Sequence, residues 1–313
     1  MKRQLRLTGC LLIASCLLTI SPVLSARAAE VVLADDQLSI AFDADSGALT
    51  RLEDKTAHWT IERRPELGVS FRLHAPLPNR RDNFVLGQKQ RAASVTKISD
   101  HQVHLEWKEL VSEHGGVLPM VFTATVTLTN GALTFAGVLA DNSSLPVETI
   151  DYPYLGDFNP LARNSSLMAR YGRTGKNGGL QSDEIYPHFG NEKGYWGVFY
   201  PLKTLESQRD LCCLIQAPAD GVCVAMNVAK LPYRLQYTFE QHPGVLSSIN
   251  NLVPPQDEIG GVPVHLEFRA CHFIFAGPHS TTSLAPVVLG CYHGGWQAGV
   301  ARYKQMHAAS AGP

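Results

Sequence analysis

Apolar and polar residues alternate along much of the chain with the period of two that is typical of β-strands. Residues 103–107 alternate apolar side chains with histidine and glutamate, and residues 122–128 alternate apolar side chains with threonines. Asn130-Gly131 follows the second run, and this dipeptide adopts the positive φ angles of a tight hairpin at low cost. The pattern therefore predicts a hairpin whose return strand begins at Leu133.

The same signal recurs in short runs that are separated by turn residues. Predicted strands cover residues 37–42, 48–52, 211–215, 222–228, 234–239 and 264–270. Strands with one apolar face are buried most economically when two sheets pack face to face. The predicted fold class is therefore all-β, with a large antiparallel two-sheet sandwich.

The C-terminus departs from this pattern. Trp296, Val300, Tyr303 and His307 recur at helical spacing and follow Gly294-Gly295, which predicts one short amphipathic helix. A helix of this length has little stability alone. It either folds back on the sandwich or begins a connector to a following domain.

The N-terminus has the features of a cleavable signal peptide. Lys2, Arg3 and Arg6 precede an apolar stretch over residues 11–24, and Ala26-Arg27-Ala28 supplies small residues at a cleavage site. The expected domains are a signal peptide over residues 1–28, a β-supersandwich over 29–290 and a C-terminal helix or connector over 291–313. The mature protein is expected to be exported, periplasmic or extracellular.

Charge narrows the range of partners. Cleavage before Ala29 removes four of the 27 basic residues and none of the 28 acidic ones, so the formal net charge changes from −1 to −5. Nucleic-acid binding needs a basic face, so nucleic acid is not an expected partner. The apolar stretch is short for a membrane span and contains Pro22, so no membrane association is expected after signal cleavage.

Five cysteines remain in the mature chain: Cys212, Cys213, Cys223, Cys271 and Cys291. An odd number leaves at least one unpaired within the monomer. For the two neighbouring runs that carry Cys212, Cys213 and Cys223, a cross-strand disulfide and small buried apolar side chains both stay open. No CxxC pair occurs, so a zinc site is not expected. No other metal and no cofactor is expected either.

Three segments resemble one family of sandwich domains. They are VVLADDQLSIAFDADSGALTRLED at residues 31–54, VETIDYPYLGDF at 147–158 and CYHGGWQAGVARYKQM at 291–306. Together they resemble, in order, the galactose mutarotase-like β-supersandwich that stands N-terminal to a (β/α)8 barrel in bacterial glycoside hydrolases. The resemblance implies that the last segment is the helix that leads out of the sandwich toward the barrel.

The resemblance also implies where catalysis takes place. In such enzymes the catalytic carboxylates lie on the barrel, and no matching positions exist in this chain, so its catalytic residues stay unknown. The expected function is carbohydrate-associated: glycan binding or support of a catalytic barrel. Two alternatives stay open, a stand-alone sugar-active enzyme of mutarotase, lyase or hydrolase type and a periplasmic interaction module without a sugar ligand.

The aromatic and polar stretch between residues 151 and 201 contains the candidate ligand-binding residues. Aromatic walls with a few placed polar groups are typical of small-molecule sites. The candidates are Tyr154, Asp183, Glu184, Tyr186, His188, Asn191 and Trp196. For Tyr and Trp in such a stretch, burial in the core is the competing interpretation.

Mutarotase chemistry needs a general acid and a general base on either side of a sugar ring. His188 or His242 could serve with Glu184 or Glu267, and nothing in their spacing selects a pair. The sequence predicts that a His and a carboxylate facing each other across about one sugar ring would favour a stand-alone enzyme over a binding domain.

Overall fold

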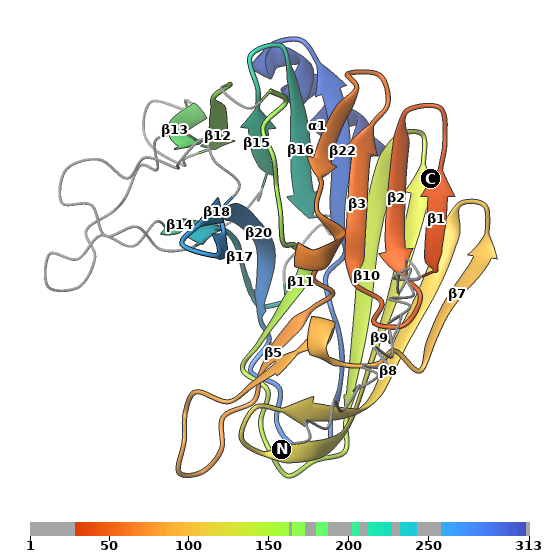
Figure 1. Cartoon of the computed structure of the whole chain (residues 1–313), viewed down its shortest axis with the longest axis vertical. Coiled ribbons are helices and arrows are strands. Elements are labelled where there is room, and N and C mark those ends of the chain that lie inside the picture. The colour runs from red at the N-terminus through yellow and green to blue at the C-terminus, as the bar shows by residue number, and fades with distance from the viewer. Residues whose placement is uncertain are drawn as a thin grey trace, which may run out of the picture.

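The computed structural model describes residues 29–162, 165–172, 180–186, 202–206, 212–226, 232–242 and 258–310. The described strands all pair antiparallel with their neighbours, in one ten-stranded, one six-stranded and one four-stranded sheet and a two-stranded pair (Figure 1). One helix lies at the C-terminal end. The predicted all-β sandwich with a short C-terminal helix is confirmed.

The ten-stranded sheet forms one layer. In spatial order it contains β13 (Leu180–Tyr186), β12 (Leu167–Gly172), β15 (Cys212–Gln216), β16 (Asp220–Met226), β22 (Val287–His293), β10 (Ala132–Asp141), β9 (Gly116–Thr129), β8 (Gln102–Ser112) and β7 (Ser94–Ser99), and β21 (Thr281–Ser283) pairs with β10. Strand β22 extends past residue 290, where the sequence analysis ended the sandwich, because it pairs with β16 as far as His293.

The six-stranded sheet forms the facing layer. Its order is β14 (Leu202–Glu206), β17 (Arg234–His242), β20 (His265–Phe273), β11 (Thr149–Leu155), β5 (Arg72–His74) and β6 (Phe84–Leu86). The remaining elements are β1 (Glu30–Ala34), β2 (Leu38–Asp43), β3 (Leu49–Asp54) and β4 (Trp59–Glu62) in the four-stranded sheet, the pair β18 (Glu258–Ile259) and β19 (Val262–Pro263), and two 3-10 turns, η1 (Pro65–Leu67) and η2 (Gly87–Lys89).

The predicted hairpin at Asn130-Gly131 is present. Asn130 and Gly131 have φ angles of 50° and 66°, and Thr129 pairs with Ala132 directly across the two-residue loop between β9 and β10. Positive φ at both loop residues matches the right-handed twist of the flanking strands. Local chemistry therefore sets the register of β9 on β10.

Aromatic side chains join the two large sheets. The ring of Phe71, next to β5, lies 4.8 Å from that of Trp107 and 4.7 Å from that of Phe122, and Tyr152 of β11 packs edge-on against Phe122 at 5.6 Å. All four side chains are buried within one hydrophobic cluster that also contains residues of the four-stranded sheet. Edge-to-face and offset rings of this kind stabilise a core beyond the area they bury.

Helix α1 (Trp296–Ser310) folds back on the ten-stranded sheet, behind β16 and β22 in Figure 1. Val300 and Tyr303 of the predicted stripe pack against the cluster under the helix, whereas Trp296 is 40% exposed and Met306 is buried. Gly299, which was not on the predicted apolar stripe, is also buried at this contact. A Cβ there would meet the Tyr292 ring at 2.8 Å, so the missing side chain lets the helix approach β22 closely. Among the described helices, none is both long and apolar enough to span a membrane.

Candidate functional site

One face of the six-stranded sheet is polar. Side chains alternate across a strand, so β20 turns Leu266, Phe268 and Ala270 into the core and His265, Glu267 and Arg269 to the opposite face. The neighbouring strand β17 adds two residues to that face, because Glu240 pairs with Glu267 and His242 pairs with His265 in the ladder. Residues that are far apart in the sequence thus become direct neighbours.

Strand β11 contributes two further side chains through an irregularity. In a regular strand, residues 151 and 154 would point to opposite faces. The ladder to β20 shifts register between Asp151 and Tyr154, and a bulge of this kind re-aims a side chain. Both residues therefore reach charged side chains on the same face of β20. The hydroxyl of Tyr154 donates to Glu267 Oε2 at 2.5 Å, and Asp151 Oδ2 lies 3.6 Å from Nε of Arg269.

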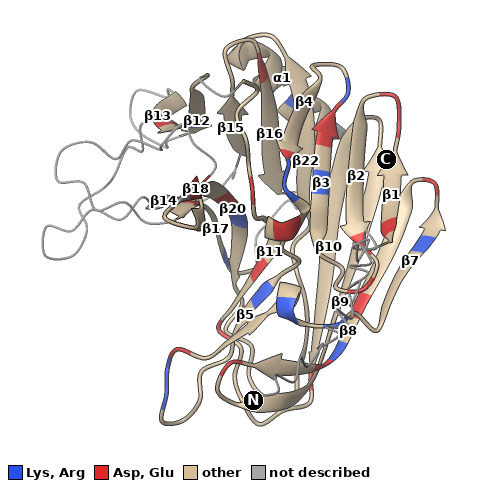
Figure 2. Ribbon diagram, viewed as in Figure 1, with Lys and Arg blue, Asp and Glu red and all other residues tan. Residues whose placement is uncertain are grey.

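We call this set the polar face: Arg72, Asp151, Tyr154, Glu240, His242, His265, Glu267 and Arg269. The charged segments of β5, β11 and β20 are coloured in Figure 2. Two arginines and three carboxylates give the face a net charge of −1 when both histidines are neutral.

Arg269 is the central cation of the polar face. Its Nη2 lies 2.6 Å from Glu240 Oε2, and its Nη1 lies 3.2 Å from Glu267 Oε2. Arg72 holds Asp151 from the other side, with Nε and Nη2 at 2.7 and 2.6 Å from Oδ2. The Arg269 and Asp151 side chains are only 9% and 2% exposed, so these contacts are largely shielded from water. Charge-assisted bonds in such surroundings fix side chains in one arrangement.

The protonation states follow from these contacts. Burial alone would raise the pKa of Glu267, but the contacts with His242, His265 and Tyr154 outweigh it, and the pKa of this carboxyl lies well below its ordinary value. Contact with Glu267 raises the pKa of His242, against the effect of burial. Burial, followed by the charge of Glu267, raises the pKa of Tyr154. At neutral pH Glu267 is therefore a carboxylate that accepts a hydrogen bond from a protonated phenol.

The two histidines stack on each other. Their ring centroids are 5.1 Å apart with 16° between the planes. Nε2 of His242 lies 3.4 Å from Glu267 Oε2, and Nε2 of His265 lies 3.7 Å from Glu267 Oε1. Of the acid–base combinations that the sequence left open, the structure thus brings His242 and Glu267 together.

The residues predicted as a ligand site fall on different elements. Tyr154 lies in the polar face. Asp183, Glu184 and Tyr186 lie in β13, at the edge of the other large sheet. Tyr186 is buried in the core, and Asp183 accepts a hydrogen bond from the Tyr171 hydroxyl at 2.6 Å. The remaining three, His188, Asn191 and Trp196, lie outside the described residues.

Sequence reasoning missed most of the polar face: Arg72, Asp151, Glu240, His265 and Arg269. One signal was available. In residues 265–271 charged or polar side chains occupy every second position between apolar ones, which indicates a strand whose second face is polar. The pattern could not predict which strands lie beside this one, because that depends on pairing between segments that are far apart in the sequence.

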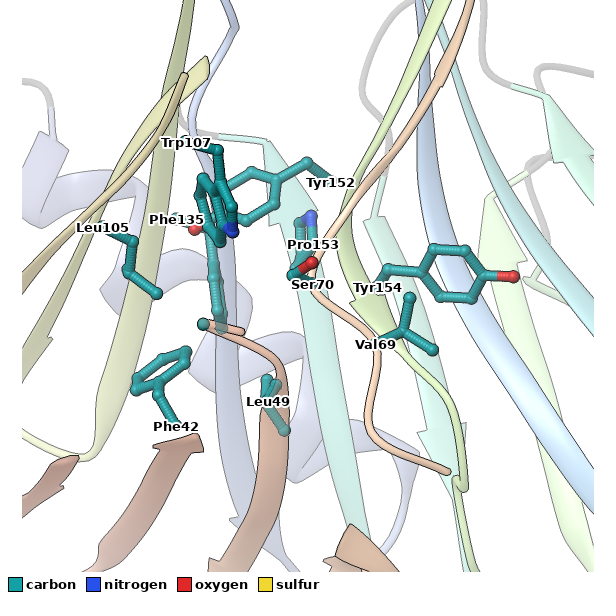
Figure 3. Close-up of a pocket in the computed structure, with 11 residues that line it drawn as sticks. Phe42, Leu49, Val69, Ser70, Leu105, Trp107, Phe135, Tyr152, Pro153 and Tyr154 are labelled. Carbon is teal, nitrogen blue, oxygen red and sulfur yellow. The ribbon is translucent and has the colours of Figure 1, made fainter. Parts of the chain in front are cut away.

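A cavity lies behind the polar face, inside the core. It has a volume of about 10 Å³ and is walled mainly by apolar side chains, including Trp107, Phe135 and Tyr152 (Figure 3). This volume corresponds to about one water molecule, which is too small for a sugar. Tyr154 borders the cavity with its ring, while its hydroxyl points away from the cavity (Figure 3). That hydroxyl donates to Glu267.

No protein-family model matches the sequence, and no curated protein matches it. Solved structures do match. A galactose mutarotase related enzyme from Lactobacillus acidophilus aligns with a TM-score of 0.52 and 10% identity over 85% of this chain and 98% of that chain. An α-mannosidase from Enterococcus faecalis aligns with a TM-score of 0.50 and 11% identity over 89% of this chain and 31% of that chain. An α-galactosidase from Lactobacillus brevis gives a TM-score of 0.50 and 9% identity over 89% of this chain and 42% of that chain.

At identities this low, the similarity concerns the fold. It extends over almost the whole of the mutarotase-related enzyme and over less than half of each glycosidase. The sequence resemblance and the structure therefore agree that this chain has the galactose mutarotase-like sandwich fold.

Proposed function

We propose that this chain is a carbohydrate-binding sandwich domain and that the polar face binds the sugar. The observation that carries the proposal is the fixed array of Arg72, Asp151, Arg269 and Glu267 around the Tyr154 side chain. The Tyr154 hydroxyl donates to Glu267, and the Arg72 and Arg269 guanidinium groups lie 5.9 and 5.8 Å from the centroid of its ring. A neutral polyol needs several donors and acceptors in fixed positions, next to apolar surface. The array offers both kinds of group on one sheet face.

Aromatic rings border the polar face on two sides. Phe84 of β6 is half-buried, and the Arg72 guanidinium lies 5.3 Å from its ring centroid. Phe273 at the end of β20 is also half-buried, and Arg234 lies over its ring at 5.4 Å. Such rings offer apolar surface to the C–H groups of a sugar, while the charged groups between them offer hydrogen bonds.

The geometry favours binding over proton transfer by the His242–Glu267 pair. An acid and a base that serve one sugar ring must stand on either side of it. The two groups are instead in contact, with 3.4 Å between Nε2 and Oε2. We therefore include in the proposal that catalysis, where it occurs, is supplied by a partner such as a (β/α)8 barrel. The proposal also includes that the signal peptide is cleaved before Ala29 and that the protein is exported.

The test is sugar binding by the chain from Ala29 to Pro313. Titration with a panel of mono- and oligosaccharides, followed by NMR or calorimetry, should give saturable binding. Arg72→Lys keeps the charge but loses the planar fork, and should weaken binding about tenfold. Arg80→Lys in an exposed loop is the matched control and should bind as the unaltered chain does. If the folded protein binds no sugar, or both variants bind equally well, the proposal is wrong.

A stand-alone sugar-active enzyme is the second candidate. One observation favours it: this chain aligns with 98% of the mutarotase-related enzyme, so in that protein the sandwich is almost the whole chain. The measurement is the rate at which sugar anomers interconvert, followed by polarimetry. An acceleration that Glu267→Gln abolishes would establish this candidate, and no acceleration by the unaltered chain would remove it.

A further inference from the structure

We propose that His242, His265 and Glu267 form a binding site for one divalent transition-metal ion, with Zn²⁺ as the representative ion. One ligand atom from each side chain lies within 4.8 Å of the other two. The ladder brings them together, because His265 and Glu267 are two residues apart on β20 and His242 pairs with His265 from β17. All three therefore project from the same face of two hydrogen-bonded strands.

The separations suit a single ion. With metal–ligand bonds of about 2.0–2.1 Å, two ligands of a tetrahedral ion lie about 3.3 Å apart. Nε2 of His242 is 3.4 Å from Glu267 Oε2, and Nε2 of His265 is 3.7 Å from Glu267 Oε1. Small side-chain rotations are enough to bring both nitrogens and one carboxylate oxygen into this range.

The hydrogen bonds of His265 leave the correct nitrogen available. Its Nδ1 lies 3.2 Å from the carbonyl oxygen of Pro263. A carbonyl can only accept, so Nδ1 carries the proton and donates, and in the neutral ring Nε2 bears a lone pair toward Glu267. Metal-binding histidines almost always donate the other ring N–H to a carbonyl or carboxylate, because this bond fixes the tautomer and the ring orientation.

The surroundings of His242 and Glu267 also suit metal binding. Nε2 of His242 is buried, and its polar neighbours are two carboxylate oxygens, Glu267 Oε2 at 3.4 Å and Glu240 Oε1 at 3.6 Å. A neutral ring nitrogen and a carboxylate oxygen at 3.4 Å are two acceptors facing each other unless a proton or a metal ion lies between them. The Tyr154 hydroxyl donates to the same oxygen, Glu267 Oε2, at 2.5 Å, as an outer partner of a metal-binding carboxylate does.

The surrounding charge permits a cation. Arg269 is the nearest positive group, with Nη1 3.2 Å from Glu267 Oε2, but Glu240 and Asp151 contact the same guanidinium. With the net charge of −1 on the polar face, a divalent ion changes the local charge to +1. This resembles the balance of catalytic zinc sites that have two histidines and one glutamate.

The ligand set selects the class of ion. Two imidazole nitrogens and one carboxylate suit Zn²⁺ or Fe²⁺, whereas Ca²⁺ and Mg²⁺ require oxygen ligands. Three protein ligands leave at least one position for water or for a hydroxyl group. The inference does not rest on the proposed sugar binding, because it concerns only the three side chains and their outer partners.

The experiment uses the mature chain after treatment with a chelator. Titration with ZnCl₂ at neutral pH, followed by calorimetry and by elemental analysis after dialysis, should give one Zn²⁺ per chain. His242→Ala, His265→Ala and Glu267→Gln should each weaken binding by about 100-fold or more. His104→Ala on β8 is the matched control, because it removes a half-buried strand histidine from the other sheet.

Replacement of Zn²⁺ by Co²⁺ gives a second readout, since the visible absorption of the bound ion reports nitrogen and oxygen ligation. His242 is 37% exposed, so its substitution should fold even if that of His265 does not. The inference is overturned if the folded chain binds no Zn²⁺ in stoichiometric amount, or if His242→Ala binds it as tightly as His104→Ala. Sugar binding that persists in the presence of chelator would leave the sugar-binding proposal standing in either case.

Discussion

At the scale of single residues, Asp151 determines how the two arginines of the polar face are held. Its side chain is 2% exposed and accepts both contacts from Arg72, while Arg269 approaches the same oxygen at 3.6 Å. The negative charge of Asp151 thus balances the positive charges of two guanidinium groups. Without it, the sides of both groups that face Asp151 would have no partner. Removing one partner of a shielded pair costs more than the pair contributes, because the other charge is left uncompensated.

Asp151→Asn should therefore lower the free energy of unfolding by about 2–4 kcal/mol. We expect a value near the lower end of this range, because the Arg72 side chain is 28% exposed and water can partly replace the lost carboxylate. Urea unfolding at neutral pH measures the change. Asp82→Asn is the control, since that side chain is 73% exposed opposite Arg80 and should change stability by less than about 0.5 kcal/mol. Equal effects of the two substitutions would show that the polar face is not an enclosed network.

His272 is a buried titratable residue on the core side of β20. Its Nε2 lies 2.7 Å from the Tyr152 carbonyl oxygen, so Nε2 donates, and Nδ1 accepts from the Tyr233 hydroxyl at 3.0 Å. That hydroxyl in turn accepts the Ala285 N–H at 2.5 Å. Burial lowers the pKa of His272 to about 4, against the opposing effects of the Tyr152 carbonyl and the Asp151 charge.

This shift predicts a loss of stability in acid. Between the unfolded pKa of about 6.5 and the folded value of about 4, the unfolded chain binds a proton that the folded chain does not. The contribution of His272 is therefore complete above pH 6.5 and falls as the pH decreases toward 4, by about 2 kcal/mol at pH 5. His272→Gln should remove this component, so the stability difference between the two proteins should shrink by that amount from pH 7 to pH 5. A constant difference across this range would contradict the assignment.

At the scale of elements, close approach explains where α1 rests. The helix covers a small cluster of Leu214, Val288 and Tyr292 on the outer side of the ten-stranded sheet. Gly299 lies at the point of contact, where a Cβ would meet Tyr292 at 2.8 Å and Leu214 at 2.9 Å. Real Cβ atoms do not approach neighbours this closely, so any larger residue must push the helix or both side chains away.

Gly299→Val should therefore destabilise the protein by about 1–3 kcal/mol, although glycine is itself a poor helix former. Ala301→Val introduces the same residue on the exposed side of the same helix and should cost only the helix-propensity difference, below about 1 kcal/mol. Thermal and urea unfolding compare the two. Higher stability of Gly299→Val than of the unaltered chain would mean that α1 does not pack against β22 in solution.

At the scale of the whole molecule, the sequence was sufficient to predict those features of the fold that neighbouring residues determine. Asn130-Gly131 determines its hairpin through its own φ angles, and the period-two pattern marks the buried face of β20. The polar face, in contrast, is not determined by residues that are neighbours in the sequence. It depends on the pairing of strands 79 residues apart, at Arg72 and Asp151, and on the bulge that re-aims Tyr154. For the same reason the sequence could name His242 and Glu267 as candidates without pairing them, since only the register of β17 on β20 makes them neighbours.

The arrangement of the core predicts how the whole domain unfolds. One hydrophobic cluster contains residues of all three larger sheets, such as Leu52 in the four-stranded, Trp107 in the ten-stranded and Phe268 in the six-stranded sheet. No described layer has a separate core large enough to remain folded alone, since the only smaller cluster lies under α1. Calorimetry on the chain from Ala29 to Pro313 should therefore show one transition, with the calorimetric enthalpy equal to the van't Hoff enthalpy. Two separated transitions would mean that one layer folds independently, and the polar face could then be studied on that layer alone.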